Sequence, residues 1–158
     1  MEDQCVIHFE QKEDRVSVVV PEENNAACHR YCGARAWFAG DYFPVIPRCQ
    51  QTESVRAEFL KSYKALKYVQ ARDVLIDYLQ ACERFTDWYN VTEIRNDLAI
   101  TQFHLGDSEA CLKSLEPIKR AFIDDPELTG RAFAPADQDW GENMVKVSRF
   151  NWQKCGGK

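Results

Sequence analysis

The feature that most constrains this chain is its seven cysteines, which are spread over all of its 158 residues. They are Cys5, Cys28, Cys32, Cys49, Cys82, Cys111 and Cys155. Only Cys28 and Cys32 are close in sequence, and no CxxC pair of the kind that holds zinc occurs. Dispersed cysteines in a short chain are typical of disulfide-linked proteins of oxidising compartments. We therefore expect disulfides, with one cysteine of the odd number left unpaired.

The composition restricts the class of protein further. Hydrophobic residues make up 45% of the chain, enough for a folded core, and its apolar runs, such as residues 18–20, are far too short to cross a bilayer. The formal net charge is -5, and no basic stripe is present that could neutralise phosphates. We expect a soluble domain that binds no nucleic acid and has no membrane span.

The start of the chain bears on its location. It begins Met-Glu-Asp-Gln and lacks the basic and apolar regions of a secretion signal. Together with the cysteines, this favours the mature form of a periplasmic or secreted protein whose leader has been removed. The alternative is a cytoplasmic protein with reduced cysteines.

The first third of the chain has the pattern of β-structure. Residues 5–9 and 15–20 are rich in β-branched side chains and partly alternate, which predicts a β-hairpin, and residues 34–42 predict a third strand or an extended arm after a loop at 21–27. An isolated hairpin is marginal in water, so we expect this sheet to pack on the rest of the chain. Residues 1–48 are thus predicted to be a small antiparallel β subdomain.

From Cys49 onward the apolar residues recur at helical spacing, which predicts a helical-hairpin subdomain over residues 49–158. Four helices are expected to begin near Thr52 or Ser54, at Ala71, near Asn90 or Thr92, and at Asp107 or Ser108. We expect the second to end near residue 85, and residues 141–155 to form a fifth helix after a surface excursion at 124–139. The inward stripes that we predict are Val55, Phe59, Tyr63 and Leu66; Leu75, Tyr78, Leu79 and Cys82; Ile94, Leu98 and Leu105; Cys111, Leu115 and Ile118; and Met144, Val147 and Phe150. The fold class is therefore predicted as α+β, with both parts in one compact unit.

Helix direction limits the disulfide pairing. If the four helices alternate in direction, Cys82 and Cys111 lie at opposite ends of the bundle, about 18 Å apart, whereas a disulfide spans at most about 7 Å between Cα atoms. Cys82 should instead pair within the group Cys28, Cys32 and Cys49. A last helix antiparallel to the one before it brings Cys155 to Cys111. Cys5 could reach Cys28 or Cys32, and the pairing among the first four cysteines stays open.

Motifs for chemistry are sparse. Cys28, His29, Cys32 and Cys49 could supply zinc ligands, and Cys28 with His29 a catalytic thiol, but disulfides explain these cysteines as well. The sequence contains no GxSxG, P-loop, GxGxxG or HExxH motif. We predict no catalytic residues, no metal and no cofactor, and hence a protein that is not an enzyme.

Aromatic residues are the best candidates for a binding surface, because Trp and Tyr are enriched at interface hot spots. One side chain of the pair Trp37-Phe38, on a predicted strand, must face away from the buried side of the sheet. The pair Trp88-Tyr89 is expected in a loop between helices. The candidate partner-binding residues are Trp37, Phe38, Tyr42, Trp88 and Tyr89.

Three stretches of the sequence resemble a known family. They are Cys28-x-x-x-Cys32-Gly33-Ala34-Arg35-Ala36-x-Phe38-x-Gly40-x-Tyr42, Arg95-Asn96-Asp97-Leu98-Ala99-Ile100, and Gly106-Asp107-x-x-x-Cys111. On these residues the chain resembles bacterial exported cysteine-rich proteins of the lysozyme inhibitor LprI-like type, over about residues 5 to 155. The resemblance implies an envelope location and binding to a lysozyme or another peptidoglycan hydrolase. It carries over no inhibitory residues.

Two functions are consistent with the sequence. The first is a periplasmic inhibitor or immunity protein that blocks a cell-wall hydrolase. The second is an adaptor built of helical hairpins, distantly similar to tetratricopeptide repeats in its Leu-Gly-Asp-x-x-Ala turn, which presents a groove between helix pairs to a peptide or protein.

Overall fold

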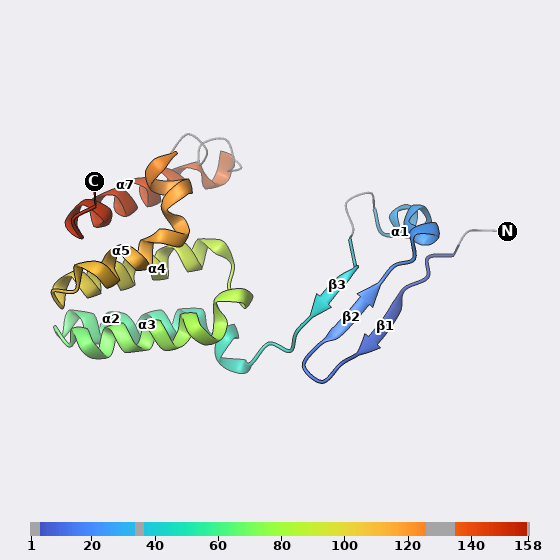
Figure 1. Ribbon diagram of the computed structural model, residues 1–158, viewed down its shortest axis with the longest axis horizontal. Helices are drawn as coiled ribbons and strands as arrows, with labels where there is room; N and C mark the ends of the chain where they lie inside the picture. The colour runs from blue at the N-terminus through green and yellow to red at the C-terminus, as the bar shows by residue number, and fades with distance from the viewer. Residues whose placement is uncertain (1–3, 34–36, 126–134, 158) are drawn as a thin grey trace. The chain divides into compact units, whose positions relative to one another are not determined.

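The computed structural model describes residues 4–33, 37–125 and 135–157, and it confirms the α+β class. The chain divides into two units, residues 1–45 and 46–158, three residues before the predicted boundary. The strands are β1 (His8–Gln11), β2 (Val16–Val19) and β3 (Gly40–Tyr42), and the helices are α1 (Asn25–Cys32), α2 (Thr52–Lys64), α3 (Tyr68–Cys82), α4 (Trp88–His104), α5 (Ser108–Lys119) and α7 (Gln138–Lys154) (Figure 1). Shorter turns are 3-10 helices at Glu22–Asn24, Pro47–Gln50, Glu83–Phe85 and Pro135–Asp137, and a π-helical turn at Arg120–Asp124.

The N-terminal unit is an antiparallel sheet of order β1-β2-β3, which contains the predicted hairpin. His8 lies opposite Val19 in the first pair, and Val16 opposite Tyr42 in the second. The third strand is shorter than predicted: it covers only Gly40–Tyr42, and residues 34–36 lie outside the described part of the chain.

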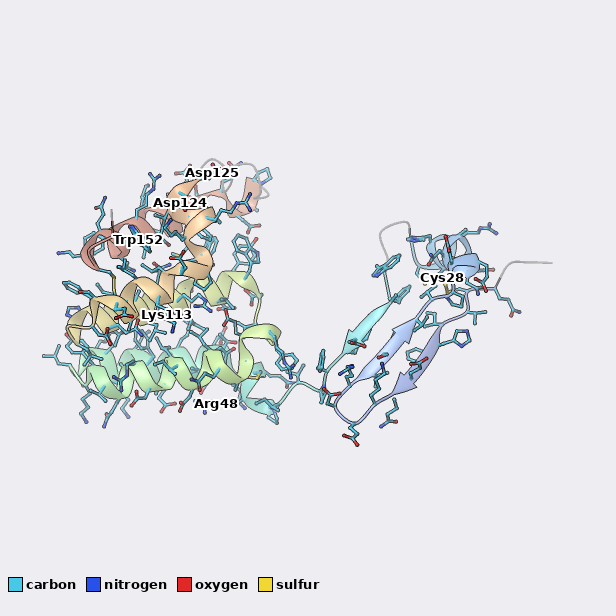
Figure 2. All side chains as sticks on the ribbon, viewed as in Figure 1. Cys28, Arg48, Lys113, Asp124, Asp125 and Trp152 are labelled. Carbon is cyan, nitrogen blue, oxygen red and sulfur yellow. A yellow bond between two sulfur atoms is a disulfide. The ribbon has the colours of Figure 1, made fainter. Side chains whose placement is uncertain are left out.

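The expected loop at residues 21–27 is wrong in its second half. A 3-10 turn leads directly into α1, whose residues Ala27 and Cys28 are buried. Cys28 is joined to Cys5, which lies before β1, so this cross-link holds the short helix against the sheet (Figure 2). The local sequence lacks an apolar periodicity long enough to indicate this helix.

The helical unit contains two antiparallel hairpins, α2 with α3 and α4 with α5, followed by α7. Several contacts show that α2, α4 and α7 run in the same direction: Tyr63 of α2 packs on His104 near the end of α4, Trp140 of α7 bonds Glu93 near its start, and Lys154 lies over Phe103. The helices α2, α4 and α7 form one layer. The helices α3 and α5 form a second layer, which packs on the first.

The helix boundaries follow from their caps. Asp107 caps α5 as predicted, since its carboxylate accepts the Ala110 amide at 2.9 Å, and Gly106 supplies the positive φ of 78° in the turn before it. α4 begins at Trp88, shortly before the start predicted near Asn90 or Thr92, because Asp87 accepts the Asn90 amide and caps the helix. Trp88 and Tyr89 are therefore in the first turn of a helix and not in a loop.

The ends of three other helices differ from the prediction. α3 begins at Tyr68, before Ala71, and ends at Cys82, where a 3-10 turn takes over to residue 85. α7 begins at Gln138, inside the predicted surface excursion. α2 ends at Lys64, so Leu66 lies in the turn with φ of 58° and is 71% exposed, which corrects its predicted place in the core.

The core of the helical unit lies around α4. One cluster packs α2 and α3 against α4 and includes Phe59, Leu75, Tyr78 and Ile94, and a second packs α5 and α7 against it and includes Leu115 and Met144. The inward stripe of α7 is Gly141, Met144, Ser148 and Asn151, so the expectation that Phe150 faces the core is wrong. Asn151 and Ser148 instead bond the buried Asn96 of α4, at 3.0 and 2.9 Å, which fixes the register of the two helices.

Candidate binding site between the helical hairpins

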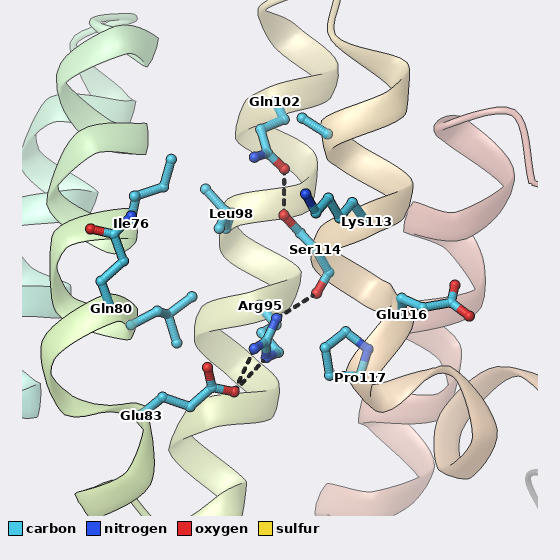
Figure 3. A pocket seen from close by; sticks show the side chains of 12 residues that line it. Ile76, Gln80, Glu83, Arg95, Leu98, Gln102, Lys113, Ser114, Glu116 and Pro117 are labelled. Carbon is cyan, nitrogen blue, oxygen red and sulfur yellow. Dashed lines mark hydrogen bonds and ion pairs between the residues drawn. The ribbon is translucent and has the colours of Figure 1, made fainter.

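A cavity of about 600 Å³ opens between the two helical hairpins (Figure 3). One wall is α3, the other is α5, and the floor is α4, so the cavity occupies the predicted groove between helix pairs. Ile76 and Leu79 line the first wall, Ala110 and Pro117 the second, and Leu98 lies in the floor. A cavity of this size with apolar walls has the dimensions of a site for a small ligand or for one or two side chains of a partner.

The floor is held by a polar network that joins the two hairpins. The Arg95 guanidinium donates from Nε to Glu83 Oε1 at 3.0 Å and from Nη1 to the Ser114 carbonyl at 3.2 Å, and its side chain is only 13% exposed. Ser114 Oγ in turn donates to Gln102 Oε1 at 2.6 Å. Because Glu83 follows α3 and Ser114 belongs to α5, Arg95 bridges the two walls and fixes their separation.

The charges around the cavity are unequally placed. Arg95 is neutralised by its ion pair with Glu83. Figure 3 shows the Lys113 ammonium on the side of α5 that faces α4, whereas the Glu116 carboxylate points away from the cavity. The charge that faces the open space is therefore positive.

A second polar cluster lies on the opposite side of α4. Arg56 of α2 forms ion pairs with Glu93 and with Asp97, the latter at 3.3 Å, and Trp140 Nε1 of α7 donates to Glu93 Oε1 at 2.8 Å. Desolvation raises the pKa of Asp97 to about 6, Arg56 opposes that rise, and Glu93 adds to it. The cluster ties α2 and α7 to α4, so we assign it to the stability of the layer.

The five aromatic residues predicted for partner binding fall into two groups in different units. Trp37 and Tyr42 of the N-terminal unit are 66% and 50% exposed, while Phe38 is half-buried and its carbonyl accepts the Tyr42 hydroxyl. Trp88 and Tyr89 pack with Phe122 and Trp140 of the helical unit, with ring centroids of Tyr89 and Trp140 4.7 Å apart. None of the five lines the cavity.

The cysteines form three disulfides: Cys5 with Cys28, Cys49 with Cys82, and Cys111 with Cys155. Cys111 with Cys155 is the pair derived from helix direction, Cys49 belongs to the group predicted for Cys82, and the exposed Cys32 keeps a free thiol. Disulfide bonding of this extent indicates an oxidising environment. Cys28 and Cys49 are consumed by disulfides, and no cluster of three or more metal-binding side chains occurs among the described residues. Within the same residues, no helix is both long and apolar enough to cross a membrane.

Comparison with family models, with curated proteins and with solved structures finds no match to this chain. The candidate site therefore rests on the geometry of the cavity alone. Sequence reasoning missed the residues that build its floor. The signal that could have found them is the seven-residue spacing of Arg95 and Gln102 on either side of Leu98, which places two polar groups and an apolar one on a single face of α4.

Proposed function

We propose that this protein is a disulfide-linked binding protein that recognises a protein partner with the cavity between its two helical hairpins. The observation that carries the proposal is the apolar cavity of about 600 Å³ over a floor fixed by the Arg95 network. A preformed site loses little conformational entropy when a partner side chain enters it, which favours binding. An adaptor of this kind needs no catalytic group.

The disulfides support the same proposal. Cys49–Cys82 ties the start of the first hairpin to the end of α3, and Cys111–Cys155 ties α5 to the end of α7. Each wall of the cavity is therefore cross-linked to a neighbouring element, which limits how far that wall can move away from it. We further propose that the protein is located in the periplasm or outside the cell, both of which are oxidising environments.

Photo-cross-linking tests this function. A photoreactive amino acid is placed at position 110, in the cavity wall, and as a matched control at Ala57, an exposed helical position of α2 away from the cavity. Each protein is exposed to an envelope extract and irradiated, and the adducts are identified by mass. We expect one protein to be cross-linked from position 110 and not from position 57. The same adducts from both positions, or none from position 110, would contradict the proposal.

A second function, inhibition of a cell-wall hydrolase or immunity to one, is favoured by the distribution of charge. Residues 1–45 contain eight acidic and four basic residues, so they account for -4 of the net charge of -5. Several acidic side chains on this unit are exposed, including Glu10, Glu13 and Asp41. A basic hydrolase would be attracted to such a surface, and opposite charge raises the rate of association.

Inhibition of a basic lysozyme at increasing salt concentration tests this second function. If the acidic unit attracts the enzyme, the association rate should fall about tenfold between low and physiological ionic strength. Replacing Glu10 and Glu13 by Gln should lower the association rate as well. The control variant Glu109→Gln, on the helical unit, should leave the association rate unchanged. An absence of inhibition at low salt would refute this function and leave the cavity proposal standing.

A further inference from the structure

The cavity holds a hydrogen-bond donor that the protein leaves unused. The Gln102 side chain is 6% exposed, and its Oε1 is occupied by the Ser114 hydroxyl. Its amide nitrogen lies on the other side of the group, toward the cavity (Figure 3), and has no acceptor among the described residues. Because this nitrogen donates to no described acceptor, it is available to an acceptor that enters the cavity.

A positive charge lies beside this donor. Lys113 lines the cavity and forms no ion pair with any described carboxylate, while Arg95 is already paired with Glu83. The chain as a whole is acidic, so a positive charge facing this cavity is contrary to its general charge pattern. The pair Gln102 and Lys113 is suited to a carboxylate, because both are donors and one is charged.

The distance between the polar and apolar parts of the cavity restricts the ligand further. Leu98 lies one helical turn before Gln102 on α4, which corresponds to about 6 Å along the axis. The last residue of a polypeptide carries a free carboxylate and its own side chain on one Cα, so an apolar last residue presents both groups within this distance. Within a chain, an apolar residue has no carboxylate of its own.

We propose that the cavity binds the C-terminal residue of a partner polypeptide, with its free carboxylate at Gln102 and Lys113 and its apolar side chain against Leu79 and Leu98. This inference rests on the proposed function and names the part of the partner that is recognised. The specificity is for an apolar last residue with an unmodified carboxylate. The polypeptide continues out of the open side of the cavity.

The probe is the dipeptide N-acetyl-phenylalanyl-leucine with a free carboxylate, compared with the same dipeptide as its C-terminal amide. Each is titrated into the isotope-labelled full chain with its disulfides intact, and binding is followed by two-dimensional NMR. We expect the free acid to shift the resonances of Leu98, Gln102 and Lys113, and to bind about tenfold more tightly than the amide.

Two variants assign the effect to the named groups. Lys113→Gln should weaken the free acid about fivefold to tenfold and leave the amide unchanged, because only the acid carries the charge. Lys61→Gln, an exposed lysine of α2 outside the cavity, should change neither. The thiol count and the unaffected part of each spectrum show that the variants are folded.

The outcomes separate this inference from the proposed function. If acid and amide bind equally at the cavity, or if Lys113→Gln has no effect, carboxylate recognition is refuted while partner binding stands. Shifts elsewhere, or none at the cavity, also refute it. The cross-linking from position 110 then decides the proposed function independently.

Discussion

Removal of the disulfide between Cys111 and Cys155 is expected to destabilise the helical unit strongly. Both residues are almost fully buried, and the bond closes a chain separation of 44 residues between α5 and the end of α7. The loss of chain entropy on closing a loop of that length corresponds to about 4 kcal/mol of stability at 25 °C. For a chain of this size, such a loss lowers the melting temperature by about 10 °C.

The variant is Cys111→Ala with Cys155→Ala, which removes the cross-link without burying a new polar group. Urea unfolding followed by far-UV circular dichroism gives the free energy of unfolding, and the denaturant slope should rise because the unfolded chain becomes less constrained. Cys32→Ala, which removes an exposed thiol, should change stability by less than about 0.5 kcal/mol. A loss below about 1 kcal/mol with an unchanged slope would refute the reasoning.

The other predictions concern the free thiol, a buried carboxyl and a helix cap. The native protein should react with one equivalent of a thiol reagent, at Cys32, whereas seven equivalents would show that the cysteines are reduced. The folded-state pKa of Asp97, about 6, is above its ordinary value of 3.8, so stability should fall by about 2 kcal/mol as pH rises from about 4 to about 6 and then level off. Asp97→Asn should remove that slope in urea unfolding, and an equal slope in the variant would refute the assignment. Asp107→Ala should cost about 1 kcal/mol, measured in the same way, by removing the cap of α5; no loss would show that the cap is unimportant.

The helical framework could be predicted from sequence because its signals are local and repeated. Apolar spacing marks the helices, and Gly106 with Asp107 marks the turn between α4 and α5. Once the number of helices is known, their alternating direction determines which ends meet, and this was sufficient to pair Cys111 with Cys155 and to exclude Cys82 with Cys111. These statements about disulfide pairing depend only on the direction of the helices, and they need no knowledge of the angles at which the helices pack.

The errors arise where a local pattern is ambiguous. Both Asp87 and Asn90 are good caps, and only the geometry of the chain after the preceding 3-10 turn decides between them. α1 is too short to show a periodicity, and its burial depends on the cross-link to Cys5. Phe150 fitted an apolar stripe, but the structure uses small and amide side chains at the α4–α7 contact, with Phe150 53% exposed.

The cavity could not be predicted from the residues that line it. It exists because Arg95 reaches Glu83 on one side and the Ser114 carbonyl on the other, and these contacts depend on the separation of α3 and α5. Composition favoured aromatic residues as the binding surface, yet the apolar residues of the cavity are aliphatic, and its polar lining includes Arg95, Gln102 and Lys113. The residues that line the cavity come from three helices, and they become neighbours only in the folded chain.

The central claim is that the cavity is where the partner binds, and its most direct test is the affinity of the partner for a protein whose cavity is filled. Ala110→Trp places a large side chain in the cavity wall, and Ala57→Trp adds the same side chain at an exposed position of α2. Isothermal titration with the cross-linked partner should show binding at least about tenfold weaker for Ala110→Trp and unchanged for Ala57→Trp. Equal affinity of both variants and the native protein would contradict the claim.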